Sequence, residues 1–356
     1  MFLRPIVTIV SNKQLKYIEK HLYLSDSRAA LDELELKNYN IERIIYLCPE
    51  DDKDLPHFSG IYYMRLTLNW QPFEQIITYF GYVHQYIREA QTFEENLLIC
   101  CPDGQTWSAA ICVAFLMKRY NLSTDGAVAT LMDCKSDVNL NQFRLQLNLW
   151  QYTGHTIRAD NTCIRQYIFD RLIDRVKTAL PLPSFGGLSL TNSMTIRKAL
   201  TFMKLLNEKD FQQRLIKIFL HYLRIIGFIE DMDPNFKLEP IISCKTCGSV
   251  LVCRSQILTA GGTDDLSIHC SDIYVELTQW IAISMLKNIA NDITGQLLCP
   301  NCNQQVGDYD WCRDVDSYCR CRRHFAIKRF QFFRITDTNV NVLPSMVNQY
   351  RDKHPK

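Results

Sequence analysis

The sequence predicts an α/β domain, a helical connector and a C-terminal cysteine-rich zinc-binding domain, in that order. Short apolar runs alternate with helical patterns over residues 17–155, and residues 160–240 carry helical patterns alone. Nine of the 15 cysteines then fall between Cys244 and Cys321. A chain of 356 residues exceeds one typical hydrophobic core, so several domains are expected. We place the boundaries at 1–158, 159–240 and 241–336, with a polar tail over 337–356.

The composition is that of a globular protein, with 47% hydrophobic and 22% charged residues. A net charge of +2 gives no global attraction to nucleic acid or membranes, so any such attraction must be local. No stretch reaches the roughly 20 apolar residues that span a bilayer. The first apolar run is too short for a secretion signal. We therefore expect an intracellular protein without membrane contact, in which paired cysteines bind metal rather than form disulfides.

The first domain shows strands and helices in alternation. Residues 44–48 and 96–100 predict buried strands because they are short, apolar and flanked by polar turns. Residues 73–87 have apolar side chains at helical spacing, and a strongly apolar helix is expected over 109–117. This order predicts a central sheet covered by helices.

Helical patterns cover residues 164–180, 195–206 and 211–226, interrupted by a proline- and glycine-containing loop. We find no candidate catalytic or ligand-binding residues in this connector, and we expect it to pack against the domains or to space them apart.

The segment from Cys100 to Ser108 lies between a predicted strand and a predicted helix. Backbone amides and a helix N-terminus at such a junction favour an anion, so a phosphate-binding loop is expected. Near these amides and the positive end of the helix dipole, the pKa of the Cys101 thiol would fall, and the resulting thiolate would be a nucleophile. The alternative is that Cys101 is a buried core cysteine.

The same segment resembles the signature of dual-specificity phosphatases, His-Cys-x-x-Gly-x-x-Arg-Ser. Residues 22–30, 114–118 and 141–147 also resemble segments of that family. The resemblance implies its α/β fold, with Cys101 as nucleophile and Ser108 as the hydroxyl residue. The phosphate loop would consist of Cys101, Pro102, Asp103, Gly104, Gln105, Thr106 and Trp107.

Four positions depart from the family pattern. Trp107 replaces the arginine whose guanidinium grips two phosphoryl oxygens, and Asn69 replaces the general acid. Cys100 replaces the histidine, and Asp103 adds a negative charge. We therefore expect a pseudophosphatase in which Cys101 is vestigial. The alternative is an active phosphatase acting on phosphotyrosine, phosphoserine or phosphothreonine through Cys101.

Two cysteine pairs, Cys244 with Cys247 and Cys299 with Cys302, predict one tetrahedral zinc site. Reduced, metal-free core cysteines are the alternative. A second site would use Cys270, Cys319 and Cys321, with a fourth ligand among His269, Cys312, Cys253 and His324.

The cysteine-rich segment resembles that of zinc-binding phosphatases of the dual-specificity phosphatase 12/Yvh type. The matching stretches are residues 270–280, 295–302 and 306–311. The cysteines of that family map onto all seven cysteines assigned above. A family histidine expected near residue 260 is Ala260 here.

A basic segment follows the last cysteine pair, with Arg320, Arg322, Arg323, Lys328 and Arg329 beside phenylalanines. This pattern suits contact with RNA, and it equally suits a half-buried strand with its arginines in water. The family resemblance implies a role in large ribosomal subunit assembly, in the nucleus and cytoplasm. The partners would be the pre-ribosomal particle, its rRNA or its ribosomal proteins, with zinc and no small-molecule cofactor. A third reading is a scaffold that uses the inactive pocket as a docking surface.

Overall fold

The computed structural model describes residues 15–49, 57–68, 75–179, 208–258, 272–288, 294–310, 332–336 and 340–342. The chain divides into two compact units, Met1–Ile157 and Arg158–Lys356. The predicted connector and the cysteine-rich segment both lie in the second unit, and their division into two domains stays a prediction. None of the described helices is long and apolar enough to cross a membrane.

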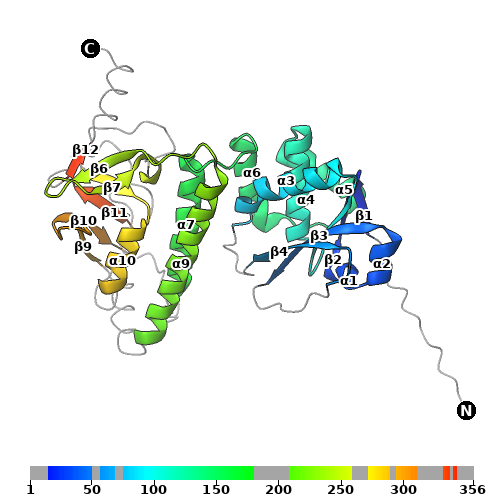
Figure 1. Ribbon diagram of the computed structural model, residues 1–356, viewed down its shortest axis with the longest axis horizontal. Helices are drawn as coiled ribbons and strands as arrows, with labels where there is room; N and C mark the ends of the chain where they lie inside the picture. Colours follow the sequence, from blue (N-terminus) through cyan, green and yellow to red (C-terminus); the bar gives the residue numbers. More distant parts are fainter. Residues whose placement is uncertain are drawn as a thin grey trace, which may run out of the picture. The chain divides into compact units, whose positions relative to one another are not determined.

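The first unit contains a five-stranded sheet in the order β1-β2-β5-β3-β4 (Figure 1). The pairs β2–β5, β5–β3 and β3–β4 are parallel, and β1 runs antiparallel to β2. Strands β3 and β5 contain the two runs predicted as buried strands. The strands are β1 (Lys16–Glu19), β2 (Leu22–Asp26), β3 (Ile41–Pro49), β4 (Tyr62–Leu68) and β5 (Asn96–Cys101).

Helices cover both faces of this sheet, which explains why its central strands are apolar without alternation. Ile44 and Leu98 pack in one cluster with Ala30 and Leu36 of the two short helices α1 and α2. Helices α3 to α6 lie on the opposite side of the sheet (Figure 1). The helices are α1 (Ser27–Ala30), α2 (Glu33–Asn38), α3 (Ile77–Thr92), α4 (Trp107–Tyr120), α5 (Thr124–Cys134), the 3-10 turn η1 (Asn141–Phe143) and α6 (Arg144–Tyr152).

The helix predicted over 73–87 is therefore α3, and its expected start at Phe73 lies outside the described residues. The strongly apolar helix predicted over 109–117 is α4. Every side chain from Trp107 to Met117 is buried. A helix that is apolar on all sides is typical of an element packed between a sheet and other helices.

The second unit begins with two helices, α7 (Thr162–Ala179) and α9 (Glu208–Met232), which pack against each other. Both correspond to predicted helices, whereas the one predicted over 195–206 lies outside the described residues. Two small sheets follow, a three-stranded one in the order β12-β6-β7 and a four-stranded one in the order β8-β11-β10-β9. Their elements are β6 (Pro240–Cys244), β7 (Val250–Cys253), the 3-10 turn η2 (Arg254–Gln256), β8 (Asp272–Val275), α10 (Gln279–Asn288), β9 (Thr294–Leu298), β10 (Gln305–Asp310), β11 (Phe332–Thr336) and β12 (Val340–Val342).

Part of the predicted polar tail is structured. Val340 pairs with Cys244 and Val342 with Ile242 across β12 and β6, and Val340 is buried. The two valines alternate with Asn341, which is exposed, as expected for a strand with one face on a core. Phe332 and Phe333 likewise lie in β11, so this end of the basic segment is a strand.

Candidate functional site

The predicted phosphate loop connects β5 to α4 at the carboxyl edge of the parallel strands. Strand β5 lies between β2 and β3 and ends at Cys101, and α4 begins at Trp107. The crevice beyond the carboxyl ends of parallel strands is the usual place for a ligand in such sheets. Cys101 therefore ends the strand before the loop, and Trp107 and Ser108 begin the helix after it.

Gly104 allows this loop to pack against β2. Its φ is +65°, in the left-handed region that disfavours side chains. A Cβ at this position would lie 2.8 Å from the backbone nitrogen of Asp26. The loop also closes on itself, because the Gly104 N–H donates to the Cys101 carbonyl at 3.2 Å. Glycine is thus required here by both backbone conformation and close approach.

Cys101 is buried and has two polar neighbours. Its Sγ lies 2.9 Å from the Ser108 Oγ, accepts the Ser108 N–H at 3.4 Å, and lies 3.0 Å from the Asp103 Oδ1. Burial raises the pKa of the Cys101 thiol and the Asp103 carboxylate raises it further, while Ser108 lowers it. The net shift is upward, and none of these main causes is a cation. The thiol is therefore protonated at neutral pH, opposite to what a nucleophilic cysteine requires.

The Asp103 carboxylate lies within the loop. Its Oδ1 accepts the backbone N–H groups of Gln105 at 3.0 Å and Thr106 at 3.2 Å. The Thr106 hydroxyl donates to both carboxylate oxygens, at 3.0 and 2.8 Å. Burial raises the pKa of Asp103, but the hydrogen bonds from Gln105, Cys101 and Thr106 lower it more, so the net shift is downward. This carboxylate is ionised at neutral pH.

Trp107 occupies the position where the phosphatase signature has arginine. It is the first residue of α4 and is 2% exposed. Its indole is thus part of the packed interior of the domain and carries no charge. The other predicted catalytic position, Asn69, lies outside the described residues.

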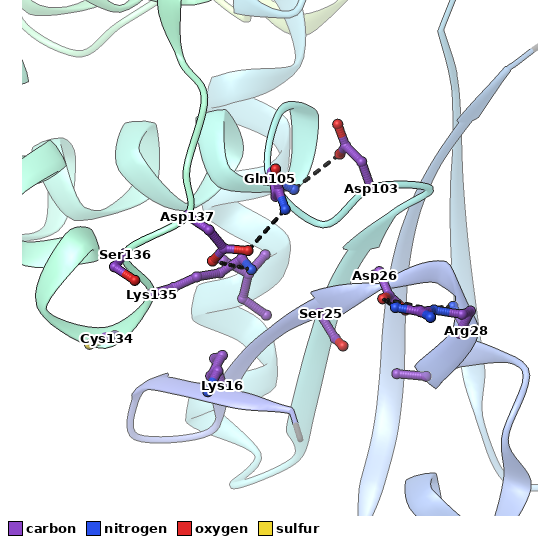
Figure 2. A pocket seen from close by; sticks show the side chains of 12 residues that line it. Lys16, Ser25, Asp26, Arg28, Asp103, Gln105, Cys134, Lys135, Ser136 and Asp137 are labelled. Atoms are coloured by element: carbon purple, nitrogen blue, oxygen red, sulfur yellow. Dashed lines mark hydrogen bonds and ion pairs between the residues drawn. The ribbon is translucent and has the colours of Figure 1, made fainter. Parts of the chain in front are cut away.

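A pocket of about 390 Å³ lies beside the loop (Figure 2). Figure 2 shows Gln105 between Asp103 and Asp137, donating its side-chain amide to Asp137 at 2.9 Å. The Lys135 ammonium forms an ion pair with the Asp137 carboxylate, with 2.7 Å between Nζ and Oδ1. Sequence reasoning did not identify this pocket, because Lys16, Lys135 and Asp137 are far in sequence from the predicted loop and only the fold brings them to it. Its charged lining residues are Lys16, Asp26, Arg28, Asp103, Lys135 and Asp137.

The second unit contains a cluster of four cysteines, Cys244, Cys247, Cys299 and Cys302, which could hold a metal ion. All four sulfur atoms lie within 4.8 Å of one another. The Sγ atoms of Cys244 and Cys302 are 3.6 Å apart, and those of Cys247 and Cys299 are 3.5 Å apart. A disulfide would require about 2.05 Å. Sulfur atoms around a tetrahedral zinc, with Zn–S bonds of about 2.3 Å, would be about 3.8 Å apart, so the donor set and its spacing fit zinc.

Two turns with the same hydrogen bonds present these cysteines. After Cys244, the Gly248 N–H donates to the Cys244 carbonyl at 2.9 Å. After Cys299, the Asn303 N–H donates to the Cys299 carbonyl at 3.0 Å. Gly248 and Asn303 both have positive φ, at 73° and 59°. Glycine and asparagine are the residues that tolerate this conformation best, so the shared geometry follows from the sequence of each pair.

Of the remaining predicted metal ligands and basic residues, Cys253 alone lies in the part of the chain that the structure describes, and it is not in this cluster. Of the candidate extra ligands, Cys253 ends β7, where its N–H donates to Gln256 at 2.9 Å. The other candidates, His269, Cys312 and His324, lie outside the described residues. So do the remaining predicted ligands and basic residues, Cys270, Cys319, Cys321, Arg320, Arg322, Arg323, Lys328 and Arg329.

Comparison with known proteins assigns the first unit to a class. Residues 22–153 match the family model "Dual specificity phosphatase, catalytic domain". This segment is therefore similar to the catalytic domain of dual specificity phosphatases, and the predicted resemblance to that family is confirmed.

Particular relatives extend the similarity over most of the chain. "Dual specificity protein phosphatase 12" of Homo sapiens is 21% identical over 343 residues, which cover 94% of this chain and 92% of that protein. "Tyrosine-protein phosphatase yvh1" of Schizosaccharomyces pombe is 20% identical over 306 residues, 85% of this chain and 78% of that protein. The crystal structure of the Yvh1 phosphatase domain from Chaetomium thermophilum matches with a TM-score of 0.36 and 16% identity, covering 40% of this chain and 97% of that one.

Proposed function

We propose that this protein is a pseudophosphatase whose cysteine-rich segment binds zinc and acts in large ribosomal subunit assembly. The observation that supports the first part is the state of the loop, where a buried Trp107 replaces the arginine and the pKa of Cys101 is raised. Catalysis in this family requires a thiolate and a cation that stabilises the phosphoryl oxygens. Loss of a charge-stabilising contact lowers rates by about 10²–10³, and loss of a general acid by about 10²–10⁴.

The second part rests on the family resemblance and on the four-cysteine cluster. A zinc ion held by Cys244, Cys247, Cys299 and Cys302 would close two turns that come from distant parts of the chain. Such a closed four-thiolate site supplies folding free energy and leaves no position for a substrate. A phosphate loop that lacks the signature arginine, in the same chain as a four-cysteine cluster, supports a protein that works by binding. The family resemblance implies that it does so in the nucleus and cytoplasm.

An active phosphatase is the second candidate, and one contact favours it. The Ser108 hydroxyl lies 2.9 Å from the Cys101 Sγ and lowers the pKa of that thiol. This is the arrangement expected if Cys101 were a leaving group and nucleophile. Here the lowering does not offset burial and Asp103, so the protonated form prevails.

Turnover of para-nitrophenyl phosphate by the full chain separates these two candidates. Cys101→Ser is the matched control because it removes only the nucleophilic sulfur. We expect the two proteins to hydrolyse the ester equally slowly. A turnover that depends on Cys101 would reject the pseudophosphatase proposal.

Affinity purification of the tagged full chain tests the ribosomal role. We expect pre-ribosomal large-subunit particles to copurify and charge reversal at Arg322, Arg323 and Arg329 to weaken this association, increasingly as salt rises. Reversal of Lys20, Lys37 and Arg119, three exposed cations of the first unit, is the control and should leave it intact. If the first triple variant copurifies like the wild type, or if the second variant loses copurification, the proposed binding surface in the second unit would be wrong.

A further inference from the structure

One oxygen of Asp103 makes an unusual set of contacts. The Asp103 Oδ1 accepts two consecutive backbone N–H groups, from Gln105 and Thr106, and the Thr106 hydroxyl. The same oxygen is 3.0 Å from the Cys101 Sγ. Backbone amides that lead into a helix N-terminus, with the cysteine sulfur beside them, are the groups that this kind of loop presents to a phosphoryl oxygen.

The contact with sulfur distinguishes this arrangement from an ordinary cap. An aspartate that only caps a turn needs the amides of the following residues and no contact with the sulfur of the preceding cysteine. Cys101 is buried at the end of β5, whereas the Asp103 side chain is exposed. A carboxylate oxygen within hydrogen-bonding distance of that sulfur therefore lies on the ligand side of the amides.

We propose that Asp103 is a built-in oxyanion that occupies the phosphoryl position of its own loop and excludes phosphate from it. This inference rests on the proposed function, and it adds a specific cause for the missing phosphate chemistry. An internal carboxylate competes at the effective concentration of a tethered group, in the millimolar range or above. A second anion at the same position would also be repelled by a like charge only a few ångströms away.

Two substitutions separate the shape of Asp103 from its charge. Asp103→Ala frees the amides of Gln105 and Thr106 and removes the charge. Asp103→Asn keeps an acceptor oxygen for those amides and removes only the charge. Asp137→Ala is the matched control, because it removes a neighbouring carboxylate that Lys135 and Gln105 contact outside the loop.

Binding of sodium tungstate to the full chain, measured by titration calorimetry, is the first measurement. We expect Asp103→Ala to bind tungstate at least about tenfold more tightly than the wild type, Asp103→Asn to bind it with an affinity between these two, and Asp137→Ala to stay close to the wild type. The second measurement is the alkylation rate of Cys101 by iodoacetamide, followed by mass spectrometry of its peptide. Both Asp103 variants should react faster than the wild type at pH 7.5, because the carboxylate no longer opposes thiolate formation.

The outcomes are distinguishable from failure of the proposed function. Wild-type protein that binds tungstate as tightly as Asp103→Ala, yet has no phosphatase activity, would overturn the role of Asp103 and leave the pseudophosphatase intact. The role of Asp103 would also be overturned if Asp103→Ala and Asp103→Asn keep native circular dichroism spectra but alkylate at the wild-type rate. If Asp103→Ala does not fold, Asp103→Asn decides through its alkylation rate, which must rise.

Discussion

Arg165 of α7 and Glu276, just before α10, form a buried ion pair across 111 residues of sequence, with Nε donating to Oε2 at 3.1 Å. A second contact joins Nη2 to Oε1, and the two side chains are 1% and 2% exposed. Arg165 also donates to Glu230 at 3.1 Å, and the Tyr222 hydroxyl donates to Glu276 at 3.3 Å. Helices α7 and α9 are thereby bound to the cysteine-rich part of the second unit through one polar network.

Breaking one side of this pair should destabilise the second unit strongly. Arg165→Met leaves the Glu276 carboxylate buried and unpaired, which typically costs about 3–5 kcal/mol. The double variant Arg165→Met, Glu276→Leu should recover part of that loss, because no charge is then left buried. Hydrogen exchange in α7 and α10 of the full chain measures the change. Arg158→Ala, which removes an exposed pair with Asp160, is the control and should have no measurable effect; a similar response in both single variants would contradict the argument.

The sequence predicts the elements of the fold better than their long-range contacts. Strand β5 and helix α4 follow from local apolar patterns, because each is buried on all sides. The pairing of Arg165 with Glu276 has no local signal, since 111 residues of sequence separate the two and neither stretch indicates a partner. Strand β12 was also missed, because three residues paired to β6 are too short to stand out in a polar segment.

Loss of one cluster cysteine should release metal and unfold its surroundings. We expect at least one zinc per chain in protein purified without chelator, and one fewer in Cys247→Ser. Structural zinc contributes about 10–16 kcal/mol of apparent binding free energy in small zinc domains, so β6, β7 and β9 should lose protection from hydrogen exchange in that variant. Elemental analysis gives the metal content. Cys134→Ser, an exposed cysteine of α5, is the control. Equal zinc in both variants would contradict the assignment.

The candidate sites were predictable to different depths. The cysteine pairs predict their cluster, because the two-residue spacing and the following Gly248 and Asn303 determine the turns. For the loop, the sequence predicts the strand that ends at Cys101 and the apolar helix that follows it. The contacts of the Asp103 carboxylate with the loop amides and with Cys101 depend on a side-chain conformation, which the sequence does not encode locally.

Acid should weaken the first unit through His84. Burial lowers the pKa of His84 to about 4, and the charges of Lys118, Arg88, Arg119 and His155 lower it in the same direction. The unfolded chain takes up a proton near pH 6.5, so stability falls as pH decreases from about 6.5 towards 4. The ring is only partly buried, and with solvent screening we expect a total loss of about 1–2 kcal/mol.

Hydrogen exchange in α3 and α4 between pH 7 and 5, corrected for intrinsic rates, measures this loss. His84→Gln should flatten the pH dependence, whereas His57→Gln, which removes an exposed ring, should not. Equal slopes in the wild type and His84→Gln would show that other groups govern acid sensitivity.

Restoring the signature arginine alone should not restore phosphatase activity. In Trp107→Arg the new guanidinium would meet the Asp103 carboxylate, which already lies in the loop, and a bidentate pair is the favoured arrangement of these two groups. Asn69 would still donate no proton to the leaving group. We expect the variant to hydrolyse para-nitrophenyl phosphate within about tenfold of Cys101→Ser.

Adding Asp103→Ala and Asn69→Asp to Trp107→Arg should raise turnover by about 10²–10⁴ above that level, because the loop can then bind the phosphoryl group while the new cation and the new acid act on it. The quadruple variant that also carries Cys101→Ser is the control and should be inactive. Activity in Trp107→Arg alone would mean that Asp103 does not obstruct the loop.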